Sequence, residues 1–552
     1  MSDIINNNFI HNIIKKDLLK NPKKKINTRF PPEPNGYLHL GHAKAIFLNF
    51  NLAKKYNGTC NLRFDDTNPK TENLKYIKSI KKDIRWLGYL WNNHSNYTSQ
   101  YFKKIYQYAK KLIKKNLAYV DQLNQIEIKK FRGTLKEKGI NSPFRNQTIK
   151  KNLSLFKKMK NGFFKEGEMC LRAKINMKSN FLLLRDPVLY RIIYKNHYHT
   201  KKKWCIYPTY DFAHCISDAL ENITYSLCTL EFLENKKLYK WILKNLNFKK
   251  NPPIQYEYSR LNLEYSILSK RKIKILIKKK IIKKWNDPRL LTLSGLRKKG
   301  YTPNSINNFC EKIGFTKQNS IIQLKLLESC IRKDLNLTVH RKMAILNPVM
   351  LIITNYPKNL KEILKVKNHP TNKNMGFREI LFSKKIYIEE EDVKKKILNS
   401  KKKISDIKIK LRYAYVIKIY KIIKDKNHNI LHILGKYKQN TIGKKLNNSL
   451  KNKIIHWVSK KNSIPAIFKF YNKLFLKKNP EKEKNILNII NPNSYYINKG
   501  FVENSILTYK INTALQFERL GYFLYINYNI KKNFLIFNKI VSLKQKKYSN
   551  KF

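Results

Sequence analysis

The sequence predicts a multidomain protein in which an α/β part is followed by a β-rich part. Three observations lead to this fold class. The chain has 552 residues, which at usual domain sizes corresponds to roughly three to five domains. Residues 25–66 show the order strand, helix, strand that is typical of a βαβ unit. Beyond about residue 340, apolar residues recur at every second position, which is strand periodicity.

The charge of the chain is strongly positive. Lys and Arg number 116 against 36 Asp and Glu, so the net charge is +80, and the pI is about 10.1. Such an excess favours polyanionic partners, nucleic acid first. However, Lys, Asn, Ile, Phe and Tyr all have A/T-rich codons, so drift in an AT-rich genome would produce the same bias. The charge therefore supports nucleic-acid binding without establishing it.

Cysteines and apolar runs limit the cofactors and the location. The seven cysteines are scattered without a C-x-x-C pair, which argues against zinc and disulfides and fits a reducing cytosol. They are Cys60, Cys170, Cys205, Cys215, Cys228, Cys310 and Cys330. No apolar run approaches the ~20 residues that span a bilayer. Residues 1–24 are predicted to form an amphipathic helical segment rather than a targeting peptide. We therefore expect a cytoplasmic protein.

The βαβ unit can be followed residue by residue. Residues 25–30 form a strand, a Pro/Gly turn follows, a helix starts at or near His39, and residues 58–66 form the next strand. A further helix ends before Gly88, which takes the position of a C′ glycine. Its apolar face consists of Leu74, Ile77, Ile80, Ile84 and Leu87.

The middle of the chain is interpreted as an insertion followed by a return to the α/β pattern. Residues 101–200 alternate helical patterns with loops, and residues 203–220 form a strand and then a helix. Residues 289–335 are predicted to form short helices. One of these has Thr302 as its N-cap and Pro303 as its first residue.

The C-terminal part is predicted to be β-rich, with its strands forming barrels. In "KIKLRYAYVIKI", residues 408–419, alternate residues are apolar, and we predict one strand, followed by a turn at 424–429. Strand character continues at 430–437, 454–459 and 466–475. The lysine runs near 276–284 and 401–403 are interpreted as solvated faces or linkers.

Two histidines three residues apart mark the start of the predicted helix after the Pro/Gly turn. His39 and His42 would lie together near the helix N-terminus, where free N–H groups and the helix dipole favour anions. Gly41 would let a flat ring approach the backbone. This arrangement suits a nucleotide whose phosphate carries developing negative charge. The alternative is that the two histidines merely cap an ordinary helix.

The stretch "PPEPNGYLHLGHAK" resembles the first signature of the class I aminoacyl-tRNA synthetases, within their glutaminyl/glutamyl branch. The second signature of that class is KMSKS, and its counterpart is identified as Leu268, Ser269 and Lys270. Leu268 replaces the usual Met. A rival "LFSKK" at 381–385 lacks both the flanking match and the preceding strand of the nucleotide fold.

The resemblance covers nearly the whole chain and is strongest to the bacterial glutaminyl members of this branch. It implies a Rossmann-like class I catalytic domain with an inserted acceptor-binding module, a helical subdomain and C-terminal anticodon-binding β-barrels. The implied bounds are 1–24 for the N-terminal helical segment, 25–100 and 210–260 for the catalytic domain, 101–209 for the insertion, 261–338 for the helical subdomain with the KMSKS-like loop, and 339–552 for the two barrels.

The resemblance also implies the activity of a glutamine–tRNA ligase. L-glutamine and ATP, with Mg²⁺ bound to the ATP, would give glutaminyl-adenylate and pyrophosphate. Glutamine would then pass to the 2′-hydroxyl of the terminal adenosine of tRNA(Gln). We expect a monomer that uses ATP as substrate, needs no zinc, has no protein-bound metal and makes no membrane contact.

The implied site residues follow from motif matching. His39, His42 and Lys270 would stabilise the transition state. The ATP site would comprise Glu33, Pro34, Asn35, His39, Leu40, Gly41, His42, Ala43, Lys44, Ala45, Thr229, Arg260, Leu261, Leu268, Ser269 and Lys270. The glutamine site would comprise Arg29, Asp65, Tyr210, His214, Cys228 and Gln255. Taken alone, Asp65 would be interpreted as an N-cap and Tyr210 as a core aromatic.

Cys228 is expected to distinguish glutamine from glutamate. Glutamyl relatives typically carry an arginine there, which suits a carboxylate, whereas a neutral cysteine suits an amide. The alternative for Cys228 is a structural buried cysteine, and both can hold. For the tRNA anticodon, Arg341 and Arg412 match positions of the family.

Three rival functions stay open at this point. They are a glutamyl-tRNA synthetase of the same branch, a noncatalytic tRNA-binding paralogue, and another nucleotidyltransferase that uses H-x-G-H. Cys228 argues against the first, the intact His39, His42 and Lys270 against the second, and the long β-rich region against the third.

Overall fold

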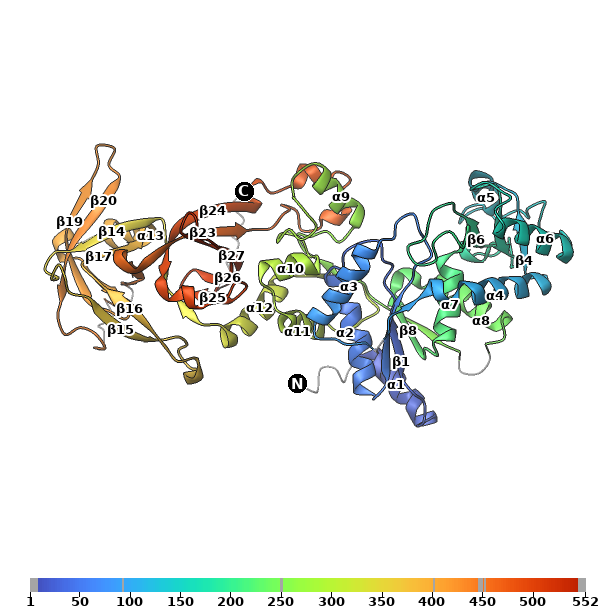
Figure 1. Cartoon of the computed structure of the whole chain (residues 1–552), viewed down its shortest axis with the longest axis horizontal. Coiled ribbons are helices and arrows are strands. Elements are labelled where there is room, and N and C mark those ends of the chain that lie inside the picture. The colour runs from blue at the N-terminus through green and yellow to red at the C-terminus, as the bar shows by residue number, and fades with distance from the viewer. Residues whose placement is uncertain are drawn as a thin grey trace. The chain divides into compact units, whose positions relative to one another are not determined.

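The computed structural model describes residues 8–91, 94–248, 252–400, 403–444, 450 and 453–544, and the chain divides into two compact units (Figure 1). The first comprises Met1–Leu263, Thr292–Ser294 and Asn307–Ile322. The second comprises Glu264–Leu291, Gly295–Ile306 and Gln323–Phe552. Residues 1–7 of the predicted N-terminal segment and 401–402 of the predicted lysine run lie outside the described residues.

A parallel sheet organises the first unit. Strands β1 (Asn27–Phe30), β2 (Thr59–Phe64) and β3 (Asn96–Tyr97) pair in parallel in that order. Strands β8 (Tyr225–Thr229) and β9 (Ile254–Tyr258) form a second parallel pair. Figure 1 shows β8 beside β1, and the Thr224 N–H donates to the Asn27 carbonyl at 2.9 Å. The predicted βαβ unit is therefore confirmed.

Helices connect and flank these strands as the sequence predicts. Helix α2 (Leu40–Lys55) links β1 to β2, and α1 (Phe9–Lys20) precedes β1. Helix α3 (Leu74–Trp86) follows β2, and Gly88 after it has φ 90°, as a C′ glycine requires. The remaining helices of this part of the unit are α7 (Tyr210–Leu220) and α8 (Asn235–Asn245).

The inserted segment contains a sheet that the sequence did not predict. Its helices are α4 (Phe102–Lys114), α5 (Gln125–Arg132) and α6 (Ile149–Lys160). The antiparallel strands β4 (Ala118–Asp121), β5 (Cys170–Ala173), β6 (Val188–Ile192) and β7 (Ile206–Pro208) pair in order. The interpretation as helices and loops was incomplete because β4 and β5 are four residues long and buried throughout. Such strands show no alternation of polar and apolar residues.

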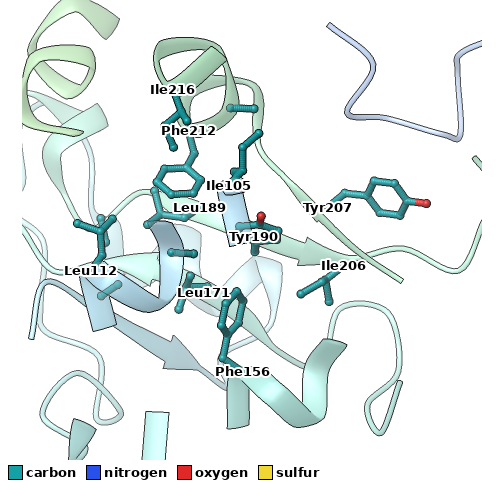
Figure 2. Close-up of a cluster of buried hydrophobic side chains, with 14 of the residues drawn as sticks. Ile105, Leu112, Phe156, Leu171, Leu189, Tyr190, Ile206, Tyr207, Phe212 and Ile216 are labelled. Atoms are coloured by element: carbon teal, nitrogen blue, oxygen red, sulfur yellow. The ribbon is translucent and has the colours of Figure 1, made fainter. Parts of the chain in front are cut away.

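One hydrophobic core joins the insertion to α7. Figure 2 shows side chains from both sides of the sheet converging, with Phe156 of α6, Leu171 of β5 and Phe212 of α7 among them. Each of these three is 0% exposed. The core therefore ties the insertion to the helix that follows β7, and hence to the parallel sheet.

Short elements follow the last parallel strand. They are β10 (Asn262–Leu263), α9 (Lys270–Lys278), α10 (Leu293–Lys299), α11 (Pro303–Ile313), β11 (Ile321–Ile322) and α12 (Leu324–Thr338). Thr302 caps α11 as predicted, since its hydroxyl accepts the Ser305 N–H at 3.2 Å. In the lysine run near 276–284, Lys278, Lys279, Lys280, Lys283 and Lys284 are all exposed, which confirms the prediction of a solvated face.

Two seven-stranded sheets make up most of the second unit. One has the order β21-β18-β19-β20-β14-β17-β22 and the other β12-β25-β26-β27-β23-β24-β13. The strands of the first are β14 (Pro348–Ile353), β17 (Lys385–Glu389), β18 (Lys408–Leu411), β19 (Val416–Lys424), β20 (Ile430–Lys438), β21 (Ile454–Ile455) and β22 (Trp457–Ser459). Those of the second are β12 (Arg341–Lys342), β13 (Ala344–Leu346), β23 (Ser463–Tyr471), β24 (Tyr495–Glu503), β25 (Ala514–Phe517), β26 (Gly521–Asn529) and β27 (Phe534–Val541). A ribbon of β15 (Glu362–Lys367) and β16 (Phe377–Phe382) and the short helix α13 (Glu390–Val393) also belong to this unit.

In each sheet, the two end strands are consecutive in the chain and are separated by a single residue. The two end strands of the first order, β21 and β22, are separated along the chain only by His456. The two end strands of the second, β12 and β13, are separated only by Met343. Because consecutive residues lie about 3.8 Å apart, both ends of each sheet must meet, so the sheets curl into barrels.

The predicted single strand at 408–419 is a hairpin instead. The chain turns between β18 and β19, and Tyr413 in the turn has φ 66°. Ile409 pairs directly with Ile417, so an odd-numbered residue of β18 always lies opposite an odd-numbered residue of β19. The odd-numbered residues therefore stay on one face of the sheet across the turn. The alternation therefore persisted through the turn and concealed it. The predicted turn at 424–429 lies between β19 and β20 and is confirmed.

Trp457 is a sensitive point of the first barrel. Its indole N–H donates to the Arg412 carbonyl at 2.9 Å, its ring packs edge-on against Phe382, and it is 0% exposed. We expect Trp457→Ala to destabilise the barrel by about 3–5 kcal/mol, because a cavity and an unpaired carbonyl remain. Urea denaturation measures this. Phe163→Ala, at a ring that is 69% exposed, is the control, and an equal midpoint in both variants would contradict the expectation.

Candidate active site

The two signature histidines form a reciprocal cap at the start of α2. The Gly41 N–H donates to Nδ1 of His39 at 3.1 Å, and the His39 N–H donates to Nδ1 of His42 at 3.1 Å. The ring centroids are 3.8 Å apart. The rings therefore lie together as predicted, and they also cap the helix. Since each Nδ1 accepts a hydrogen bond, a neutral ring carries its proton on Nε2.

The turn before these histidines is held against the ends of β1 and β2. The Asp65 N–H donates to the Pro32 carbonyl at 3.3 Å, and the Asn73 N–H donates to the Pro34 carbonyl at 3.1 Å. The Asn35 N–H donates to the Glu33 carbonyl at 2.9 Å. These bonds place residues 33–35 beside the helix N-terminus, at the carboxyl ends of parallel strands, where open α/β sheets bind ligands.

The ammonium of Lys44, another predicted ATP-site residue, is already engaged within the protein. The group is 4% exposed and donates to the Ser259 carbonyl at 2.9 Å, and burial lowers its pKa to about 8. It links α2 to the end of β9. Nearby, Leu261 is buried, whereas the exposed Arg260 pairs with Glu231 at 2.6 Å.

A buried ion cluster lies beneath this edge of the sheet. Arg29 of β1 binds Asp218 of α7 through Nε at 3.0 Å, and Arg63 of β2 binds the same carboxylate at 2.8 Å. His214 lies between them, 3.1 Å from Arg29 Nη2 and 3.2 Å from Arg63 Nη2. Burial alone would raise the pKa of Asp218, but Arg29 and its neighbours hold it well below the usual range.

Asp65 follows β2 and is oriented by this cluster. Its Oδ1 accepts from Arg63 Nε at 2.7 Å and from the Thr98 hydroxyl at 3.1 Å. Its Oδ2 is buried and finds no hydrogen-bond partner among the described residues, although His214 Nδ1 lies 3.6 Å away. Burial opposes ionisation, yet Arg63 lowers the pKa of Asp65 below its usual value. An ionised, unsatisfied oxygen of this kind suits a cationic ligand group.

A small cavity beside Asp65 brings together four of the six residues predicted to bind glutamine. Tyr210, His214, Cys228 and Gln255 all line it. The other lining residues are Asp211, Phe232, Asn235 and Tyr239. No Lys or Arg is among the described residues that line it. Burial raises the pKa of Cys228 to about 12, so the thiol stays neutral. The cavity therefore presents polar groups, the Asp211 carboxyl among them, and no lysine or arginine within its described lining.

The second signature forms a capped loop in the second unit. The Leu268 and Ser269 N–H groups both donate to Oε1 of Glu481, at 2.7 and 3.0 Å. Ser269 caps α9, which begins at Lys270. The Lys272 ammonium donates to the Glu481 carbonyl at 2.6 Å. Glu481 therefore holds the loop, and no sequence pattern indicated this role.

The rival motif at 381–385 belongs to the barrel. Ser383 is buried, donates to the Lys385 carbonyl at 3.0 Å and lies 2.7 Å from the Ser459 hydroxyl. These bonds connect β17 to β22, so the segment is structural.

The two arginines predicted at the anticodon site lie among unsatisfied polar atoms. Arg341 of β12 pairs in register with Gln516 of β25. Arg341 Nε, Arg412 Nε and Gln516 Oε1 are buried without hydrogen-bond partners among the described residues, as are both ring nitrogens of His456. Arg412 also pairs with Glu518 at 2.5 Å. Gln516 and His456 were not predicted from the sequence, because only strand pairing in the closed barrels brings Gln516 beside Arg341 and His456 near Arg412.

Comparison with known proteins decides the family. A family model described as "tRNA synthetases class I (E and Q), catalytic domain" matches residues 25–337. Two models described as "tRNA synthetases class I (E and Q), anti-codon binding domain" match residues 339–438 and 454–525. The chain belongs to the class I tRNA synthetases of the E and Q type. The predicted fold class is confirmed by these matches.

Curated relatives of this synthetase match it over nearly its full length. A protein named glutamine–tRNA ligase from Buchnera aphidicola subsp. Schizaphis graminum is 56% identical and covers 98% of this chain and 97% of its own. The protein of that name from Buchnera aphidicola subsp. Baizongia pistaciae is 57% identical, with 98% of each chain covered. That from Aliivibrio fischeri is 48% identical, covering 97% and 98%.

Neither a metal cluster nor a membrane helix occurs in the part of the synthetase that the structure describes. No group of three or more His, Cys, Asp or Glu side chains there could hold a metal ion. Every helix within the described ranges is too short or too polar to cross a bilayer.

A carboxylate–histidine cluster next to Asp65 escaped the sequence analysis. Asp66 accepts from the Ser99 and Tyr198 hydroxyls, both at 2.7 Å, and its carbonyl lies 3.1 Å from His197 Nε2. Glu72 Oε2 lies 3.5 Å from the same nitrogen and is buried without a hydrogen-bond partner among the described residues. Burial raises the pKa of Asp66 to about 7 and that of Glu72 to about 8. This cluster connects the end of β2 to the insertion.

Glu72 should make stability fall as pH rises. The folded synthetase keeps a proton on Glu72 up to about pH 8, whereas the unfolded chain loses it near the ordinary value of 4.5. Between these values the folded state binds more protons, so the free energy of unfolding decreases by up to ~1.4 kcal/mol per pH unit. We expect Glu72→Gln to flatten the fall in melting temperature between about pH 4.5 and 8.

The matched control is Glu391→Gln, at a side chain that is 73% exposed. It should keep the pH dependence of the original chain. A Glu72→Gln profile as steep as that of the control would show that Glu72 does not hold the proton.

Proposed function

We propose that this synthetase is a glutamine–tRNA ligase. It activates L-glutamine with ATP to glutaminyl-adenylate and transfers glutamine to the 2′-hydroxyl of the terminal adenosine of tRNA(Gln). The relatives that match over nearly the whole chain at 48–57% identity bear that name. The observation that carries the proposal is a cavity whose described lining has no lysine or arginine, with an ionised Asp65 oxygen 3.6 Å from the lining residue His214.

The amino acid binds with its ammonium on Asp65 and its side chain in the cavity. Asp65 Oδ2 lacks a hydrogen-bond partner among the described residues, and the ammonium supplies one. Tyr210, His214, Cys228 and Gln255 surround the side chain. A glutamate carboxylate would be buried there without a lysine or arginine in the lining, which is unfavourable.

Arg29 does not change this selectivity. Its guanidinium already binds Asp218 at 3.0 Å, the Leu227 carbonyl at 2.9 Å and the Ser226 hydroxyl at 2.7 Å. It is therefore a compensated charge behind His214, and it sets the shape of the pocket rather than offering a free cation.

ATP enters as its Mg²⁺ complex beside the start of α2. Residues Glu33 to Asn35 and the helix N-terminus from His39 to Ala45 contact the nucleotide, joined by Thr229, Arg260 and Leu261. The Nε2–H groups of His39 and His42 donate to the reacting α-phosphate. Lys270, on the loop with Leu268 and Ser269, neutralises the departing pyrophosphate. Charge stabilisation of this kind lowers the barrier without a proton transfer.

The tRNA is bound by the remaining parts of the chain. Residues 101–209 hold the acceptor end, and residues 339–552 read the anticodon through Arg341 and Arg412. Arg341 and Arg412 are both partly exposed, and guanidinium groups suit bases splayed out of a single-stranded loop. The protein acts as a monomer in the cytoplasm.

The remaining domain bounds are proposed on the same grounds. They are 1–24 for the N-terminal helical segment, 25–100 with 210–260 for the catalytic domain, and 261–338 for the helical subdomain.

Aminoacylation tests this function directly. Glutamine and glutamate are crossed with tRNA(Gln) and tRNA(Glu) transcripts in the presence of ATP and Mg²⁺. We expect charging only with glutamine on tRNA(Gln), and Asp65→Asn should lower kcat/KM for glutamine at least ~100-fold because the ammonium loses its ionic partner. Charging with glutamate would establish the glutamyl rival. Binding of tRNA without any charging would establish a noncatalytic paralogue.

Glu481 should matter for the rate although it belongs to the distal part of the chain. Glu481→Ala removes the acceptor of two loop N–H groups, so the signature loop should lose its fixed position. Two such bonds justify a loss of about tenfold in kcat with little change in the KM for glutamine. Glu483→Ala is the matched control, since its carboxylate binds only Lys477 among the described residues. Equal rates for the two variants would rule out a role for the cap.

A further inference from the structure

Gln255 has a fixed orientation at the wall of the amino-acid cavity. It lies on β9, is 3% exposed and lines the cavity. Its Nε2 donates to the Phe232 carbonyl at 2.9 Å and to Oε1 of Glu257 at 3.1 Å. A carboxamide nitrogen carries two hydrogens, so both are used. Toward a ligand the group can therefore present only its carbonyl oxygen, which is an acceptor.

Glu257 and Lys236 continue the chain of contacts away from the cavity. Glu257 lies two residues after Gln255, hence on the same face of β9, and is 5% exposed. Its Oε2 accepts from the Lys236 ammonium at 3.1 Å. Lys236 is the second residue of α8, and its side chain is 27% exposed. A half-buried cation is thus connected through a buried carboxylate to a carboxamide at the cavity wall.

This arrangement prevents the carboxamide of Gln255 from turning over. A rotation of half a turn would bring Gln255 Oε1 against the Phe232 carbonyl and the Glu257 carboxylate. Both are acceptors, so two hydrogen bonds would be replaced by two repulsive contacts. The Lys236 ammonium holds Oε2 of Glu257 at 3.1 Å, which keeps the other carboxylate oxygen in place as the acceptor for the Gln255 nitrogen.

We propose that Lys236 and Glu257 are positioning residues that select glutamine over glutamate through Gln255. The inference rests on the proposed function and deepens it. The amide nitrogen of glutamine donates to the acceptor that Gln255 presents. A glutamate carboxylate has no hydrogen at neutral pH, so two acceptors would face each other. Selectivity then arises from a repulsive element in addition to the neutral Cys228.

The first experiment replaces Lys236 in the full-length synthetase. Aminoacylation of tRNA(Gln) is measured with glutamine and with glutamate, and the ratio of the two kcat/KM values is the discrimination. We expect Lys236→Met to lower the discrimination about tenfold, mainly through a higher KM for glutamine, and Lys236→Arg to restore it. Lys240→Met, one turn along the exposed face of α8, is the matched control and should leave discrimination unchanged.

Rescue by a conservative substitution and the separation of KM from kcat distinguish positioning from a merely structural role. A structural role would change the rates with both amino acids equally, whereas positioning of Gln255 should change mainly the KM for glutamine and should be restored by Lys236→Arg. Glu257→Gln removes the carboxylate that accepts from Gln255, so it should also lose discrimination. The double variant should lose no more than the single ones.

Two results would overturn the inference. One is unchanged discrimination in Lys236→Met and Glu257→Gln while the unaltered chain charges glutamine. The other is an equal loss of kcat/KM for both amino acids, which would mean that the residues only support the fold. If the unaltered chain instead charges glutamate, the proposed function itself fails, and that outcome appears before any variant is made.

Discussion

The balance of charge beneath the parallel sheet is the constraint on which the catalytic half depends. Arg29 and Arg63 come from adjacent strands, and Asp65 and Asp218 come from the end of β2 and from α7. All four side chains are nearly inaccessible to water. Because an unpaired buried charge is highly unfavourable, the strands and α7 must keep one relative position for the ions to remain paired. The same geometry leaves Oδ2 of Asp65 without a hydrogen-bond partner among the described residues.

Local features were predictable from the sequence, and the structure explains why. The cap at Thr302 and the helix end at Gly88 depend on residues within one turn of each other, and the βαβ unit followed from the order of its strand, helix and strand patterns. The histidine pair was predictable for the same reason, since spacing alone puts both rings at one helix end. The family resemblance then supplied Asp65, Tyr210 and Cys228, which no local pattern distinguishes from core residues.

Features that depend on distant pairing were not predictable. The sheet of the insertion is made of short strands, of which β4 and β5 are buried throughout and lack alternation. The hairpin at Tyr413 was concealed because its register preserves parity. Glu481 lies more than 200 residues from the loop that it caps. The chain of contacts from Gln255 through Glu257 to Lys236 runs from a strand to a helix. A single sequence contains no signal for such partners until the fold brings them together.

Barrel closure through Met343 and His456 has a consequence for a chain of net charge +80. An open sheet has two rows of unpaired backbone groups, and these recruit strands from other molecules. Here each perimeter is continuous, so neither barrel offers a template for fibrous assembly. Lysines can therefore be numerous on the outer faces without being needed to prevent an edge strand from pairing with another molecule. Mutations can therefore change the residues of that surface freely, whereas Met343 and His456, which separate the end strands, cannot be changed in the same way.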